Sequence, residues 1–267
     1  MNKNKINYTK LVLSKEELAK IAPLYRKRYI MFISMIRDLT LLSKFIHYTS
    51  NSCDTEAKES LLQYANTMAS IFFLTTLISK IHEMWNFLRR NDIMEELQTS
   101  SLSPELKKSL DEINSFFLKN PNRSEEKTKE NKLFEFIRNK FGFHYEYKDE
   151  IDPIINEAFD KFKDKEFEMY LTEVDSANDI FPSLNSVVFI CLLKKMNSLA
   201  FPGDDQQKMR ELFLLAAKGA GLFVNFCSLY LAERFKIKWE SVKEVKIKAQ
   251  DISKIKLPVI VVKNKES

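Results

Sequence analysis

The sequence is poor in the residues that make tight turns, with four glycines and seven prolines in 267 residues. A sandwich or barrel needs such residues at most of its connections, so their scarcity argues against a fold with many strands. The chain instead holds 21 phenylalanines, whose large rings fill the spaces between packed helices. We therefore predict one mainly α-helical fold with a phenylalanine-rich core.

Cysteine and histidine are also scarce, with three of each. The cysteines, Cys53, Cys191 and Cys227, are odd in number and far apart, which is typical of reduced thiols. No Cys-x-x-Cys pair, glycine-rich phosphate loop or G-x-S-x-G elbow occurs in the sequence. We therefore expect neither a metal site nor another cofactor.

The chain lacks a strong charge of one sign, because 42 basic residues face 37 acidic ones and the formal net charge is +5. A histone-like polycation is excluded. A local excess of lysine marks the C-terminal tail, which we place at residues 237–267 and expect to be partly β. This tail is either solvated or contacts phosphate or an acidic partner.

Apolar residues recur at helical spacing over residues 14–236, which we interpret as a single helical domain. Capping residues and prolines place its helices at 14–48 with a restart at Pro23, 55–90, 104–120, 123–141, 152–162, 185–197 and 204–235. Alternating patterns near 166–172 and in the tail predict a small β appendage to this multi-helix bundle.

One apolar run, Leu212 to Ala232, approaches the length of a membrane-spanning helix. Lys218 interrupts it, and Gly219 and Gly221 suit close contact between helices, so we expect a fully buried central helix rather than a membrane span. The first residues lack the apolar segment of a secretory signal. A cytoplasmic location is therefore predicted.

The most specific motif is a heptapeptide at the end of an expected helix, Arg138-Asn139-Lys140-Phe141-Gly142-Phe143-His144. It resembles the mark of the HEPN superfamily, which is an arginine, a polar residue and then a histidine with four to six positions between arginine and histidine. Arg138, Asn139 and His144 match that mark. The resemblance covers this short motif and the helical context only.

The resemblance implies a bundle of four or five helices with the motif at a helix end, and a homodimer in which both motifs face one cleft. It implies a metal-independent endoribonuclease with Arg138, Asn139 and His144 in the active site, and a role as a toxin or phage-defence effector with an antitoxin or regulatory partner. Many members of the superfamily lack nuclease activity, so the resemblance supports the fold more strongly than the reaction.

Elementary chemistry gives the motif residues the same roles. An imidazole such as that of His144 exchanges protons near neutral pH, and the guanidinium of Arg138 can meet the charge of a phosphorane-like transition state. Asn139 is suited to orient the imidazole or hold a phosphate oxygen. Lys140, Tyr145 and Tyr147 are the candidate residues for contacting the RNA backbone and stacking its bases.

The spacing of the motif poses a geometric difficulty. Six residues along a regular helix separate two side chains by about 120°, so Arg138 and His144 do not converge on one straight helix. Either Gly142, the only glycine among the first 200 residues, ends the helix, or residues of two subunits combine.

Other interpretations stay open. In the structural one, Arg138 pairs with Glu135 or Asp149 and His144 caps its helix, while the other two histidines, His47 and His82, are structural or exposed. In a second functional reading, the chain is a catalytically inactive helical module that binds nucleotide, nucleic acid or a protein partner. In a further interpretation, the chain is a purely structural or membrane-associated helical protein.

Overall fold

The computed structural model describes residues 6–12, 19–20, 23–51, 61–99, 102–120, 126–142, 157, 182–235 and 238–245. In these ranges it contains β1 (Ile6–Val12), α2 (Pro23–Asn51), α3 (Leu61–Leu88), α4 (Asn91–Thr99), α5 (Pro104–Phe117), α6 (Lys129–Ile137), the π-helical turn η1 (Arg138–Gly142), α8 (Pro182–Ser198), α9 (Asp205–Phe235) and β2 (Lys238–Val245). The predicted mainly α-helical, multi-helix fold is confirmed.

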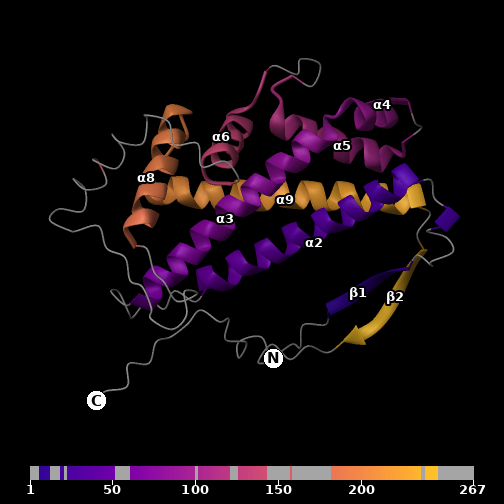
Figure 1. Cartoon of the computed structure of the whole chain (residues 1–267), viewed down its shortest axis with the longest axis horizontal. Coiled ribbons are helices and arrows are strands. Elements are labelled where there is room, and N and C mark those ends of the chain that lie inside the picture. The colour runs from indigo at the N-terminus through magenta and orange to yellow at the C-terminus, as the bar shows by residue number, and fades with distance from the viewer. Residues whose placement is uncertain are drawn as a thin grey trace.

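Three long helices, α2, α3 and α9, form the frame of the fold (Figure 1). Each contacts the other two, and α5 lies along α9 while α6 packs against α3. Figure 1 shows α8 at one end of α9 and α4 near the other end. This arrangement encloses one large hydrophobic core to which α2 through α9 contribute.

Aromatic rings from four helices meet in this core. Phe117 of α5 is fully buried and stacks on Trp85 of α3, with ring centres 4.7 Å apart and planes 7° from parallel. Phe134 of α6 and Phe223 of α9 present their rings to Phe117 at 6.1 Å and 6.0 Å. The phenylalanine-rich core expected from composition is therefore present.

Helix α5 begins where its sequence predicts. Ser103 caps the helix by accepting a 3.2 Å hydrogen bond from the backbone N–H of Leu106, and Pro104 occupies the first turn, where a missing N–H does no harm. The helix ends at Phe117 rather than near residue 120, because Leu118 turns extended and forms a bridge with Lys127.

Helix α6 begins later than expected. The charged stretch 123–132 was predicted to form its first turns, but residues 126–128 are not helical and Thr128 is the N-cap. The Thr128 hydroxyl donates to the Phe116 carbonyl at 2.8 Å and accepts from the Asn131 N–H at 3.1 Å. This link to the end of α5 fixes the first residue of α6 at Lys129.

Helix α9 is buried on one side only, so the expectation of a fully buried helix was wrong. Phe223 and Cys227 are fully buried, whereas Leu214 is 56% exposed and Lys218 also faces solvent. Among the described helices, α9 alone is long and apolar enough to cross a membrane. Its most apolar stretch of 18 residues has a mean hydropathy of 1.7, and 44% of that stretch is buried within the protein. A core helix of a soluble protein meets the same criterion.

Helix α4 is attached to α2 and α9 through a buried carboxylate. Glu96 of α4 forms an ion pair with Arg28 of α2, accepts a 2.9 Å hydrogen bond from the Tyr230 hydroxyl and lies 3.7 Å from Arg234 Nε. A charge that is removed from water needs such partners. The cluster therefore fixes the end of α9 against the start of α2.

The described strands form one antiparallel pair in which Leu11 is opposite Trp239 and Lys10 is opposite Glu240. The predicted β appendage is not supported in the form expected. Residues 166–172 lie outside the described residues, and the partner of β2 is β1, a segment in which no strand was predicted. The helix expected at 152–162 is also outside, apart from Glu157, which is helical.

Candidate functional site

The first five residues of the heptapeptide form η1, which continues directly from α6. A π turn is rare and frequently occurs at functional sites, because it forces an extra residue into the helical ladder. The helix therefore distorts before Gly142 instead of staying regular up to it. His144, Tyr145 and Tyr147 lie outside the described residues, and the geometry between Arg138 and His144 stays a prediction.

Arg138 is held by two oxygen acceptors. Its Nε donates to Glu83 Oε1 of α3 at 2.5 Å, and its Nη1 donates to Asn139 Oδ1 at 2.9 Å. Among the described residues no partner is found for Nη2. The Arg138 side chain is 26% exposed and that of Glu83 is 39% exposed, so the pair lies at the edge of the core, within reach of solvent.

The partners expected for Arg138 differ from those observed. Glu135 was one expected partner, but both of its carboxylate oxygens accept from Lys127 Nζ at 2.8 Å. Asp149, the other expected partner, is outside the described residues. The observed partner, Glu83, is 55 positions away along the chain, and sequence reasoning missed it.

His82 of α3 is 4% exposed and interacts with Asn131 and Glu135 of α6, close to Arg138. Its Nδ1 is 3.3 Å from the amide nitrogen of Asn86. Burial lowers the pKa of His82, and this effect outweighs the Glu135 carboxylate, which raises it. The imidazole is therefore a neutral structural group near pH 7, which agrees with the structural option predicted for it; His47 is exposed on α2.

A row of polar residues on α3 is the signal in the sequence that could have identified Glu83 and His82. Ser79, His82, Glu83 and Asn86 follow one another at intervals of three, one and three residues in the C-terminal part of α3. Such spacing places side chains on one helical face. The row indicates a polar partner for α3, although it does not identify α6 as that partner.

Helix α8 brings basic side chains to η1. Lys140 of η1 and Lys194 of α8 both lower the pKa of Cys191, although burial dominates and raises it to about 11. Lys195 places its Nζ 5.2 Å from the centre of the Phe136 ring. Lysines from two separate segments, η1 and α8, therefore lie around Cys191 and Phe136.

Apolar contacts anchor η1 to α8. The half-buried ring of Phe141 packs against Val187, Ile190 and Cys191 of α8 and meets the edge of Phe136 at 6.0 Å. Sequence reasoning gave Phe141 no role. The contact matters because it holds the π turn, and with it Lys140, against the lysines of α8.

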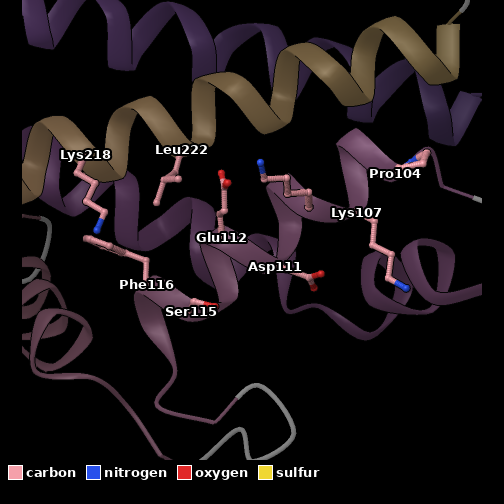
Figure 2. Close-up of a pocket in the computed structure, with 9 residues that line it drawn as sticks. Pro104, Lys107, Asp111, Glu112, Ser115, Phe116, Lys218 and Leu222 are labelled. Carbon is pink, nitrogen blue, oxygen red and sulfur yellow. The ribbon is translucent and has the colours of Figure 1, made fainter.

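Two surface hollows lined by described residues are relevant to the motif. One, of about 620 Å³, lies between α5 and α9, where Lys218 approaches the Phe116 ring and Glu112 and Lys107 also line the wall (Figure 2). It carries both charge signs and none of the motif residues. The second, of about 370 Å³, lies between α2 and α3 and is lined by Met31, Met84 and also Glu83, so it adjoins the motif.

No group of three or more histidine, cysteine, aspartate or glutamate side chains with the geometry of a metal site occurs in the described part of the chain. The side chains of the motif itself are a guanidinium, an amide, a lysine amine and, by sequence, an imidazole.

No protein-family model, curated protein or solved structure matches this chain. The likeness to the HEPN superfamily consequently rests on Arg138, Asn139 and His144 and on the helical fold.

Proposed function

We propose that this chain is a metal-independent endoribonuclease of HEPN type, which cleaves RNA by attack of the ribose 2′-hydroxyl. His144 acts as general acid or base, Arg138 stabilises the phosphate and Asn139 orients Arg138. The observation that carries the proposal is the arginine of the motif, held at a π turn with its Nη2 group without a partner among the described residues.

The held guanidinium suits electrostatic catalysis. Negative charge grows on the phosphate oxygens in the transition state, and donors that are already oriented stabilise it without reorganising. A guanidinium carries five N–H donors in a fixed plane. Two of them bind Glu83 and Asn139, so the plane is set, and the remaining donors bind no described residue and can meet a phosphate.

The basic surroundings of η1 support RNA as the substrate. Lys140 of η1 and Lys194 of α8 both act on Cys191, and Lys195 approaches Phe136 of α6, although Lys194 also forms an ion pair with Glu157. Lysines beside a cleavage site hold the phosphate backbone by charge without reading its sequence. We propose that the RNA backbone follows this lysine group to Arg138, with Tyr145 and Tyr147 stacking bases.

We further propose that the active form is a homodimer joined through an apolar row on α2 and α3. Of the six exposed large hydrophobic residues in the described part of the chain, five belong to this row: Ile30, Met31, Ile33, Leu41 and Phe72. The row borders the hollow that Glu83 lines. In the proposed dimer a second copy of the chain covers this row, next to the hollow that Glu83 lines.

The dimer is tested by sedimentation velocity on wild type and on Ile33→Glu, which places a charge in the row. We expect a wild-type dimer and a variant monomer, because burying an unpaired carboxylate at an interface is costly. Leu214→Glu, at the exposed site on α9, is the matched control and should stay dimeric. A monomeric wild type would contradict the dimer.

The Arg138–Glu83 pair also favours a second candidate function. A guanidinium that already faces a carboxylate at 2.5 Å attracts a phosphate less strongly than a free one. This fits a catalytically inactive module that binds nucleotide, nucleic acid or a protein partner. A role as a toxin or defence effector, with an antitoxin-like partner in the cytoplasm, is proposed from the resemblance alone.

Cleavage of a labelled RNA of mixed sequence in excess EDTA tests the reaction. We expect wild type to leave 2′,3′-cyclic phosphate ends, and His144→Ala and Arg138→Ala to lose about 100-fold or more in rate. Arg210→Ala, which removes an exposed arginine of α9, is the control and should cleave normally. Absence of cleavage by wild type would leave the binding module as the function, and cleavage that EDTA abolishes would exclude a metal-independent reaction.

A further inference from the structure

The acidic partner of the motif arginine comes from a different helix than the motif itself. Glu83 lies on α3, and its Oε1 accepts the hydrogen bond from Arg138 Nε of η1. We propose that Glu83 is a positioning residue of the reaction, which fixes the Arg138 guanidinium so that its remaining donors face the scissile phosphate. This inference rests on the proposed endoribonuclease function.

The backbone of Glu83 is held firmly by the core, as a positioning residue requires. Its neighbours on α3, Ile81, Met84 and Trp85, are 0%, 3% and 2% exposed and are part of the large core. The carboxylate itself reaches the surface, where it meets Arg138. Core packing thus fixes the Cα of Glu83, and only its short side chain must be ordered to hold the guanidinium.

Stability alone does not account for this pair. A partly exposed ion pair contributes about 0–1 kcal/mol, because solvent screens the charges and two side chains lose freedom. An arginine that reacts with a phosphate gains more from being held, because misplacing a catalytic group by about 1 Å can cost about 100-fold in rate. Asn139 alone sets one donor of the guanidinium, and a second acceptor is needed to fix its plane.

The negative charge of Glu83 gives the role a kinetic signature. The carboxylate repels an approaching phosphate, while its hydrogen bond orients the arginine that stabilises the transition state. Removing the carboxylate should therefore tighten RNA binding, which lowers KM, and also lower kcat. Loss of fold would instead lower the active fraction of the protein and leave KM unchanged.

The test compares the full chain with Glu83→Ala and Glu83→Gln in the RNA cleavage assay with EDTA, measuring kcat and KM separately. We expect Glu83→Ala to lose about tenfold or more in kcat with a fall in KM. Glu83→Gln keeps an acceptor oxygen and should recover part of that loss. Glu135→Gln is the matched control, because Glu135 pairs with Lys127 rather than Arg138, and it should keep its kcat within about twofold.

A nuclear magnetic resonance measurement separates this inference from the proposed function. The Nε–H signal of Arg138, assigned by its loss in Arg138→Lys, should exchange slowly in wild type and rapidly in Glu83→Ala. A signal that Glu83→Ala leaves unchanged overturns the positioning role whatever the activity. If the Nε–H exchanges slowly in a wild type that does not cleave RNA, both the endoribonuclease function and the catalytic role of Glu83 are overturned. An active wild type with an unaffected Glu83→Ala kcat overturns the positioning role alone.

Discussion

Gly219 and Gly221 of α9 are two residues apart and differ in what surrounds them. A Cβ added at Gly219 would lie 3.3 Å from Ile81 Cγ2 of α3 and 3.4 Å from Phe134 Cε2 of α6. A Cβ added at Gly221 would meet nothing within 4 Å. The two glycines therefore allow the same substitution to be compared with and without a packing conflict.

Replacing glycine by alanine inside a helix stabilises it by about 0.5–1 kcal/mol, since the unfolded chain loses freedom. We expect Gly221→Ala to gain this amount in full. At Gly219 the same gain is offset by overpacking, which costs about 1–3 kcal/mol in a tight core. Gly219→Ala should therefore be about 1–3 kcal/mol less stable than Gly221→Ala.

Urea unfolding followed by circular dichroism at 222 nm measures the difference directly. Thermal unfolding offers a second reading, in which each kcal/mol corresponds to about 2–4 °C for a domain near this size. Equal stability of the two variants would refute the close approach of α9 to α3 and α6. It would also reopen the alternative that α9 is a membrane-associated helix.

Three further outcomes follow from the core. Phe117→Ala should cost about 3–5 kcal/mol in urea unfolding and change the fluorescence of Trp85, on which its ring stacks; a smaller cost would show a loosely packed site. Burial holds the pKa of His82 below its usual 6.5. As the pH drops below 6.5, the unfolded chain therefore takes up a proton at this site before the folded chain does. The free energy of unfolding should be highest above pH 6.5 and fall as the pH drops below it. His82→Gln should lose that part of the pH dependence, and an unchanged dependence would contradict the assignment. Burial raises the pKa of Cys191 to about 11 and also raises that of Cys227, so both thiols should react with a thiol reagent at pH 8 only after unfolding; rapid reaction of either in the folded chain would show an open site.

The helices that the sequence predicted well are those with local signals at their ends. Helix α5 starts at Pro104 behind the capping Ser103, and α9 spans 205–235 where 204–235 was predicted. A cap or a helical period is a property of neighbouring residues, so it can be recognised before the fold is known. Free Cys191 and Cys227 in buried positions likewise follow from their apolar neighbours.

The predictions that were wrong depended on contacts between distant segments. Helix α6 starts at Lys129 because Thr128 is hydrogen-bonded to the end of α5, which charge patterning does not reveal. The exposed side of α9 follows from the lack of a described helix over Leu214, since an apolar composition alone suggested burial all round.

By itself, the sequence determined the helical fold class and singled out Arg138-Asn139, because composition, periodicity and a rare motif are written along the chain. Only the tertiary structure decided that Arg138 meets Glu83, that His82 is buried close to Arg138 and that the lysines of α8 lie beside η1. The physical reason is that ion pairs and burial depend on which helix faces are in contact. The packing of the whole core determines those contacts.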